Sequence, residues 1–160
     1  MNVQVDVQQA AVDTSALSSS DITTWITRVI AATGRSTGGE LSVRIVDADE
    51  MRRLNREFRG KDNPTNVLSF PAGDIDGLPD GAMRPLGDLV VCASVVRDEA
   101  MAQGKVIEDH WAHMIVHGTL HLLGFDHDND SEAADMEGRE IEILLTHGVA
   151  NPYGESPRET

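Results

Sequence analysis

The sequence predicts an α+β fold, α/β by some conventions, in which a small mixed β-sheet packs against about five helices. Segments with strand-like apolar patterns are interleaved with segments of helical periodicity, in an irregular order rather than a strict alternation. The chain has 160 residues, 40% of them hydrophobic, which suffices for one core. We therefore expect a single domain over residues 1–147, followed by a disordered tail over 148–160.

The first elements follow from two strand patterns around one helical pattern. Residues 3–8 and 41–46 alternate between apolar and polar side chains, which predicts two half-buried strands. Between them, with Ser20 or Asp21 as its N-cap and Gly34 after its end, lies a predicted helix. Its apolar residues recur at helical spacing: Ile22, Trp25, Ile26, Val29 and Ile30.

The middle of the chain predicts a helix, two strands and a further helix. Asp47 and Glu50 are expected to form a capping box for a helix whose apolar side carries Met51, Leu54 and Phe58. Residues 66–70 predict a short strand, which the following proline confines to a sheet edge or a strand end. After a loop over 73–85, residues 86–93 predict a more buried strand, and residues 94–104 predict a short helix.

Two helices complete the predicted fold. Residues 108–123 have helical periodicity but are apolar on most sides, which is typical of a buried helix. Residues 131–148 predict an amphipathic helix with Ser131 as its cap. The residues expected to face inward on this last helix are Met136, Ile141, Leu144 and Leu145.

Composition and charge narrow the functional classes. The single cysteine, Cys92, cannot form an internal disulfide, and no basic and apolar leader or long apolar run is present, so we expect a cytoplasmic protein without membrane association. A net charge of −14 would by itself argue against a nucleic-acid partner. The charge is polarised, however: ten acidic residues face two arginines from Leu122 onward, whereas residues 51–61 hold five basic residues and one acid.

Three histidines in the stretch HGTLHLLGFDH predict a metal site at the end of the buried helix. His117 and His121 are four residues apart and therefore lie on one face of that helix. Gly124 can adopt the left-handed conformation that ends a helix, so that His127 can fold back to the same point. Three imidazoles with an open position form the arrangement of a catalytic zinc rather than a structural one. Further along the helix, His110 and His113 are expected to be supporting or structural groups.

The spacing of these histidines matches the metzincin peptidases, except that Gly118 stands where their glutamate base would be. Without that carboxylate, amide hydrolysis by their mechanism is disfavoured. A phosphodiester suits the site better, because a metal and an arginine can stabilise its charge directly. The proton acceptor stays open between a metal hydroxide, Asp126, Asp128 and a hydroxyl group of the substrate itself, with His113 as a weaker candidate.

A basic patch in residues 51–61 supports an anionic substrate. Its members are Arg52, Arg56, Arg59 and Lys61. A solvated helix face would explain a charge run alone, but the patch has almost no compensating acids and ends in a turn. The planar guanidinium group can donate two hydrogen bonds to one phosphate.

The stretches HGTLHLLGFDH and FRGKDNPTNVLSFP, joined by LGDLVVCA, resemble the YbeY family of bacterial endoribonucleases from about Leu41 to His147. The resemblance implies one zinc ion on His117, His121 and His127, with Arg59 as a functional arginine. It also implies cleavage of single-stranded RNA in small-subunit rRNA maturation and ribosome quality control, with ribosomal proteins or an assembly GTPase as partners.

Two alternatives stay open at this point. The first is a metzincin-like metallopeptidase. The second is a non-catalytic ribosome assembly factor in which zinc is structural, and metal removal would distinguish it because the fold would then be lost with the ion. The metal itself is also open, since three imidazoles accept nickel or copper as well as zinc.

Overall fold

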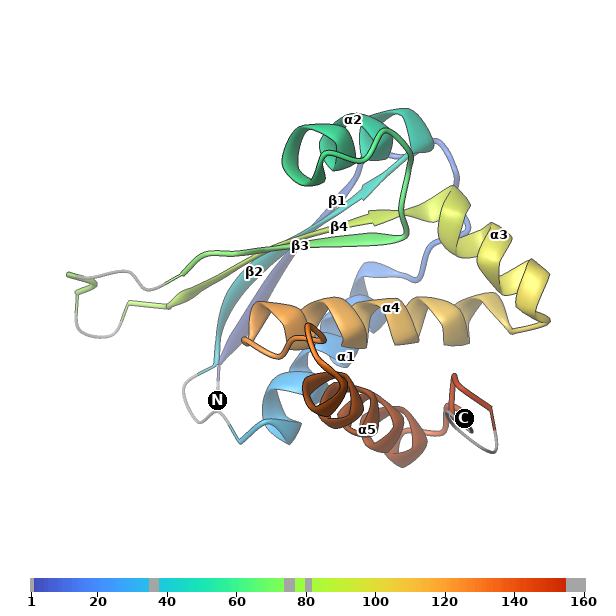
Figure 1. The fold of residues 1–160 in the computed structure, drawn as a ribbon. Coiled ribbons are helices and arrows are strands. Elements are labelled where there is room, and N and C mark those ends of the chain that lie inside the picture. Colours follow the sequence, from blue (N-terminus) through green and yellow to red (C-terminus); the bar gives the residue numbers. More distant parts are fainter. Residues whose placement is uncertain (1, 35–37, 74–76, 80–81, 155–160) are drawn as a thin grey trace.

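The computed structural model describes residues 2–34, 38–73, 77–79 and 82–154. Four strands form one sheet in the order β1-β2-β4-β3 (Figure 1). Strands β1 (Val3–Gln9), β2 (Gly39–Val46) and β4 (Pro85–Cys92) are parallel, whereas β3 (Val67–Pro71) pairs antiparallel with β4. The predicted mixed sheet is confirmed, and Pro71 ends an edge strand as expected.

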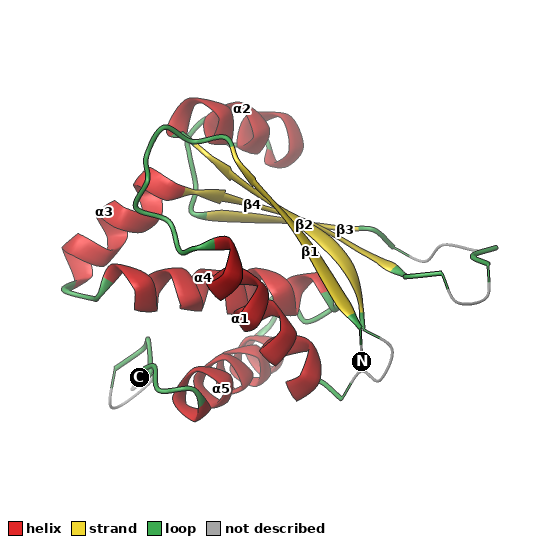
Figure 2. Cartoon of the chain, turned by 180° about the vertical axis from the view of Figure 1, so that it is seen from behind, coloured by secondary structure: helices red, strands yellow, loops and turns green. Residues whose placement is uncertain are grey.

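Five helices cover the two faces of the sheet unequally. Helices α1 (Ser19–Ala32) and α4 (Ile107–Leu122) cross the same face, and α5 (Asp130–Thr146) packs on their far side (Figure 2). Helix α2 (Ala48–Arg59) lies on the opposite face, and α3 (Ala93–Gln103) connects β4 to α4 (Figure 1). The fold class predicted from the sequence, with five helices around a small mixed sheet, is thus confirmed.

Helix α4 forms the centre of the molecule. Its side chains are buried on nearly every side, from His110 to Leu122, and Trp111, Ile115 and Leu120 have no exposed surface. This burial explains why its sequence is apolar all round. Because α4 lies between the sheet and α5, the position of its last turns is set by packing from both sides.

Two predicted helix caps are wrong. The first helix begins after Ser18, whose Oγ accepts a hydrogen bond from the Asp21 backbone N–H, so neither Ser20 nor Asp21 is the cap. No capping box forms at the start of α2, where Asp47 makes no side-chain cap. Its carboxylate instead accepts a hydrogen bond from Val12 N at 2.9 Å, and Glu50 forms an ion pair with Arg44.

The inward faces of two helices also differ from the prediction. On α5 the cap is Asn129 instead of Ser131, and Ile143 is buried while Leu145 is 55% exposed. On α2 only Met51 and Asn55 are buried, and Phe58 is 59% exposed. Helix α2 covers a small apolar cluster, so one narrow stripe suffices to hold it.

The segment after α5 is described as far as Gly154, and residues 155–160 lie outside the described residues. The domain boundary at residue 147 and the disordered tail stay predictions. In the described part, no helix is both long and apolar enough to cross a bilayer.

Candidate metal centre

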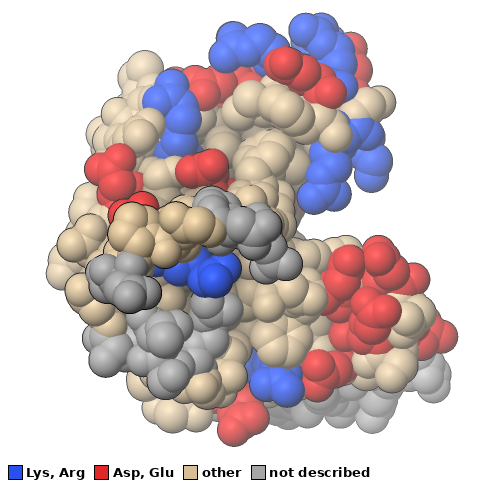
Figure 3. Space-filling model, turned by 90° about the vertical axis from the view of Figure 1, so that its left-hand side faces the viewer, with Lys and Arg blue, Asp and Glu red and all other residues tan. Residues whose placement is uncertain are grey.

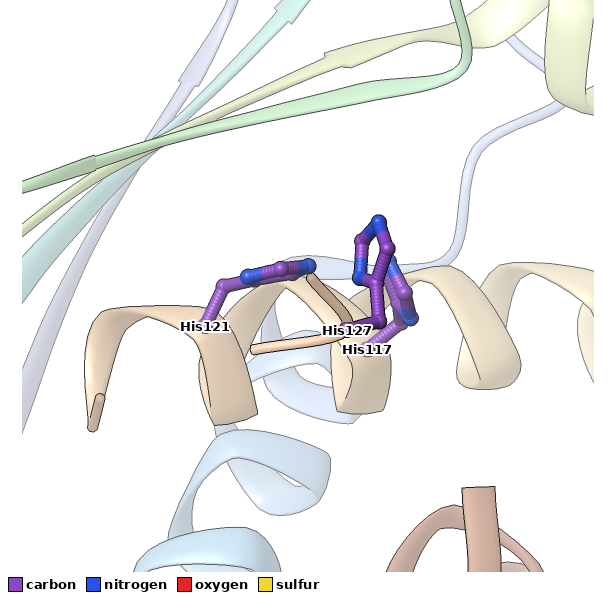
Figure 4. Close-up of side chains that lie close together, drawn as sticks. All are labelled: His117, His121 and His127. Carbon is purple, nitrogen blue, oxygen red and sulfur yellow. The ribbon is translucent and has the colours of Figure 1, made fainter. Parts of the chain in front are cut away.

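The structure brings the three predicted ligands together at the end of α4. His117 and His121 lie on the last turns of the helix, and their ring centroids are 4.8 Å apart. The chain then turns at Gly124, whose φ of 99° is a conformation that favours glycine. His127 returns to the same point, with its ring centroid 4.9 Å from that of His121 (Figure 4).

The geometry of these rings fits one metal ion. One nitrogen from each ring lies within 4.8 Å of the others, so a single ion between the rings could contact all three. Among the described residues, no fourth His, Cys, Asp or Glu belongs to this group. Three imidazoles with room for a further ligand match the donor set of a catalytic zinc site.

The protonation state of His121 also suits metal binding. Burial, followed by the neighbouring His117 and His127, lowers the pKa of His121 to about 4. The imidazole is therefore neutral near pH 7, which is the form that binds a metal. Arg59 is among the charges that lower this pKa, which indicates that its guanidinium group lies on the same side of the molecule.

The histidines lie in a cleft of about 750 Å³. Its walls come from the end of α2 and the following turn, from β3, and from the loop after α4. Figure 3 shows the cleft as a notch between a basic upper lip and an acidic lower lip. We call the end of α2 and the following turn, with the cleft residues Arg59 and Lys61, the basic lip, and the loop after α4, with the cleft residues Asp126 and Asp128, the acidic lip.

The other two members of the predicted basic patch lie elsewhere. Arg52 and Arg56 are exposed on α2 and do not line the cleft. Both contact Asp62: Arg52 forms a two-pronged ion pair at 2.9 and 3.0 Å, and Arg56 lies 3.7 Å away. The prediction that the patch has almost no compensating acid is therefore wrong for these two arginines, because Asp62, which directly follows Lys61, pairs with both.

The acidic lip contains a second group of carboxylates. Asp126, Asp128 and Glu132 have oxygen atoms within 4.8 Å of one another. A hydrogen bond from the His127 backbone N–H lowers the pKa of Asp126, whereas a hydrogen bond with Asp126 raises the pKa of Asp128. Of the proton acceptors considered from the sequence, these two aspartates line the cleft, and His113 does not.

Gly118 has a structural reason for its identity. A Cβ atom at this position would lie 2.9 Å from Leu89 Cδ2 and 3.2 Å from Val67 Cγ2, because α4 packs closely on the sheet here. In addition, Ser69 Oγ donates a hydrogen bond to the Gly118 carbonyl at 3.0 Å. The position that carries the glutamate base in metzincin peptidases therefore faces a packed sheet, where a side chain would fit only if its neighbours moved.

Glu140 of α5 is a site residue that the sequence did not reveal. It is 0% exposed, and its Oε1 lies 3.0 Å from His117 Nδ1 and 2.9 Å from His113 Nε2. Burial alone would raise the pKa of Glu140. The hydrogen bonds from the two histidines outweigh this effect and lower the pKa to about 2. His110 is similarly held, with Nε2 at 2.9 Å from Glu99. The expected supporting roles of His110 and His113 agree with these contacts.

Comparison with known proteins identifies the family. Residues 4–148 match the family model described as Endoribonuclease YbeY. The Endoribonuclease YbeY of Halorhodospira halophila is 59% identical over 131 residues, which cover 82% of this chain and 84% of the relative. That of Alcanivorax borkumensis is 46% identical over 157 residues, which cover 98% and 89%.

A solved structure supports the fold alone. The solution structure of TM1509 from Thermotoga maritima matches with a TM-score of 0.52 at 23% identity, and the match covers 96% of this chain and 99% of the other. The family assignment comes from the sequence matches, which extend over both the histidine cluster and the basic lip. On this evidence, the chain belongs to the YbeY family of endoribonucleases.

Proposed function

We propose that this protein is a metal-dependent, single-strand-specific endoribonuclease that acts in the maturation of small-subunit ribosomal RNA. The observation that carries the proposal is the position of the three histidines in a cleft whose opposite lip holds Arg59 and Lys61. The family membership and the name of the relatives support the same activity. Zinc is the proposed metal, because three neutral imidazoles with an open position form a donor set that zinc accepts.

In this proposal, the metal, the basic residues and the acidic residues of the cleft have different roles in catalysis. When bound, zinc would polarise the scissile phosphate and lower the pKa of water. Arg59 is the catalytic residue that holds and neutralises the phosphate, because its planar fork can donate two hydrogen bonds to phosphate oxygens. Lys61 adds a second positive charge on the same lip. Asp126 and Asp128 line the opposite side of the cleft and are the chain's own candidates for the proton acceptor, beside a metal hydroxide and the RNA 2′-hydroxyl.

The shape of the cleft favours a single strand. Its residues come from the turn after α2, from the edge strand β3 and from the loop after α4, so a substrate must enter between two lips. A flexible single strand can bend to bring one phosphate to the histidines, and its bases can turn outward. An RNA duplex is stiff, and its deep, narrow major groove keeps side chains away from the bases.

Arg52 and Arg56 are proposed to extend the basic surface beyond the cleft. Both are exposed on α2, the helix that ends at Arg59. Asp62 neutralises part of this charge, so RNA phosphates must compete with its carboxylate for the two arginines. Their contribution to binding is therefore smaller than that of Arg59 and Lys61.

The cellular role is proposed on the same basis. An enzyme that processes rRNA ends would act in the cytoplasm, with small-subunit ribosomal proteins or an assembly GTPase as partners. The strongly acidic remainder of the surface suits this role, because net negative charge suppresses unspecific binding to nucleic acid away from the cleft.

The two alternative functions have less support. A metzincin-like peptidase needs a carboxylate base next to the first histidine, where this chain has Gly118, which packs against Leu89 and Val67 of the sheet. A purely structural zinc would have four protein ligands, whereas the histidine group has three among the described residues.

The experiment compares cleavage of a single-stranded RNA and of the same sequence in a duplex. Wild-type protein purified without an affinity tag should cut the single strand, and His121→Ala and Arg59→Gln should each abolish or strongly reduce this cleavage. Arg53→Gln, an exposed arginine on the same helix, is the matched control and should cut like the wild type. Equal cleavage by His121→Ala and the wild type would refute the proposal.

A further inference from the structure

Glu140 has an environment that a simple structural role does not explain. It is a charged side chain without exposed surface, in the second layer of helices behind α4. Burying a carboxylate is strongly unfavourable unless hydrogen bonds satisfy it. Three donors surround it here, and two of them are imidazoles of α4. One of these imidazoles belongs to the metal ligand His117.

The directions of these hydrogen bonds follow from the charge of Glu140. A carboxyl group is ionised near pH 7, and a carboxylate surrounded by three donors can only accept hydrogen bonds. His117 must therefore donate through Nδ1, and His113 must donate through Nε2. A neutral imidazole carries one proton, so His117 presents the lone pair of Nε2 to the cleft. This is the tautomer that a metal on the cleft side requires.

The same contact excludes His113 from the ligand set. Its Nε2 is committed to Glu140, and its Nδ1 is buried without a hydrogen-bond partner in the structure. Its side chain is only 9% exposed, compared with 26% for His117. Glu140 thus orients His117 as a metal ligand and keeps His113 out of the ligand set.

The chain beyond α5 contributes the third donor. The Tyr153 hydroxyl donates to Glu140 Oε2 at 3.1 Å, and its ring packs edge-on against the His113 ring, with centroids 5.4 Å apart. This segment is anchored on both sides, since Lys105 Nζ donates to the Pro152 carbonyl at 2.9 Å and Val149 N to the Leu144 carbonyl at 2.8 Å. The family model ends at residue 148, so Tyr153 lies outside the matched region.

We propose that Glu140 is a positioning residue that keeps a proton on His117 Nδ1, and that Tyr153 holds Glu140 in place, so that the segment after α5 tunes the metal affinity of the cleft. Carboxylates that accept a hydrogen bond from a metal-bound histidine fix its orientation and tautomer and raise its basicity. The two histidines hold Oε1 of Glu140 and the Tyr153 hydroxyl holds Oε2, so both oxygens of the carboxylate are fixed. The inference rests on the proposed metal centre but not on the cleavage of RNA.

The test uses three full-length variants: Glu140→Gln, Tyr153→Phe and the matched control Glu142→Gln, which changes an exposed carboxylate on the same helix. The first measurement is nitrogen NMR of the imidazoles in metal-free protein, which shows which ring nitrogen carries the proton. The second is zinc affinity, measured by competition with a chromophoric chelator. Thermal unfolding of the metal-free proteins verifies that each variant is folded.

Wild type and Glu142→Gln should show His117 protonated at Nδ1, and Glu140→Gln should populate the other tautomer and lose about 10- to 100-fold in zinc affinity. Tyr153→Phe should keep the tautomer and lose about 2- to 10-fold, as expected for one hydrogen bond. Unchanged zinc affinity in Tyr153→Phe would remove the role of the terminal segment. Wild-type His117 protonated at Nε2 would overturn the proposal even if Glu140→Gln failed to fold.

Because neither measurement uses RNA, a protein that passes both tests but does not cut RNA would refute the proposed function and leave this inference intact. Conversely, a protein that cuts RNA but shows the wrong tautomer would refute only the inference. The two failures are therefore distinguishable.

Discussion

Substitution of Gly118 by alanine tests how closely α4 packs on the sheet at the metal centre. The added methyl group would lie 2.9 Å from Leu89 Cδ2 and 3.2 Å from Val67 Cγ2. Carbon atoms in favourable contact lie about 3.5 to 4.0 Å apart. Leu89 is 0% exposed and has neighbours on all sides. Either this side chain or the helix itself must therefore move.

The expected cost follows from two opposing effects. Overpacking a buried site by one methyl group costs about 1–3 kcal/mol. Alanine in place of glycine inside a helix returns about 1 kcal/mol. Gly118→Ala should therefore lower the free energy of unfolding by about 0–2 kcal/mol.

The matched control is Gly138→Ala on α5, where a Cβ atom would have no neighbour within 4 Å. This variant has the helix propensity gain without the clash, so it should be more stable than the wild type by up to about 1 kcal/mol. The difference between the two variants isolates the packing cost, about 1–3 kcal/mol. Urea unfolding of both metal-free proteins gives this difference. If Gly118→Ala is stabilised as much as Gly138→Ala, the close approach of α4 to the sheet is refuted.

Four further predictions concern the site and its surroundings. Removal of the metal with a chelator should abolish RNA cleavage, but the metal-free protein should stay folded and still unfold cooperatively when followed by circular dichroism, because the core around α4 does not include the ion. Loss of the folded state on chelation would favour a structural zinc. Arg59→Gln should reduce cleavage about 100-fold at constant metal content, while Arg53→Gln should not, as single-turnover assays would show. Asp62→Asn should tighten RNA binding in a filter assay, because it releases the two arginines that pair with this aspartate; unchanged affinity would place these arginines outside the RNA path. The folded-state pKa of Glu140 lies below its usual value of 4.5, so the stability that its ionised form contributes is complete above pH 4.5 and lost as the pH falls toward 2. The difference in unfolding free energy between wild type and Glu140→Gln should therefore shrink over this range. A difference that does not depend on pH would contradict the assignment.

The features that could be predicted from the sequence are those that local patterns determine. Alternating residues in β1 and β2 and the apolar surface of α4 correspond to the strands and helix observed. The histidine cluster could also be predicted from the sequence, because it is determined by the spacing of two histidines on one helix and by a glycine bend before the third. Each of these signals depends on neighbours within about ten residues.

The features that could not be predicted depend on partners distant in sequence. Asp47 and Glu50 have the pattern of a capping box, but Val12 and Arg44 take their side chains. Glu140 is a charged residue on an amphipathic helix, which usually indicates a solvent-exposed position. Its burial becomes understandable only when the two histidines of α4 and Tyr153 are in place.

Gly118 shows both sides of this comparison. Its sequence position indicated the absence of a peptidase base, which pointed away from amide hydrolysis. The structural reason for the glycine is its close contact with Leu89 and Val67 of the sheet, and this contact could be seen only in the folded structure. A sequence pattern could therefore predict the chemistry of the site while its structural cause stayed hidden.

The measurement that tests the metal centre most directly is anomalous diffraction at the zinc edge from crystals of untagged protein. The account predicts one ion per chain, about 2.0 to 2.1 Å from a nitrogen of each of His117, His121 and His127, with the next ligand a solvent molecule. The nitrogen from His117 should be Nε2, with Nδ1 still directed at Glu140. An ion at another place, or a fourth protein ligand in the open position, would contradict it.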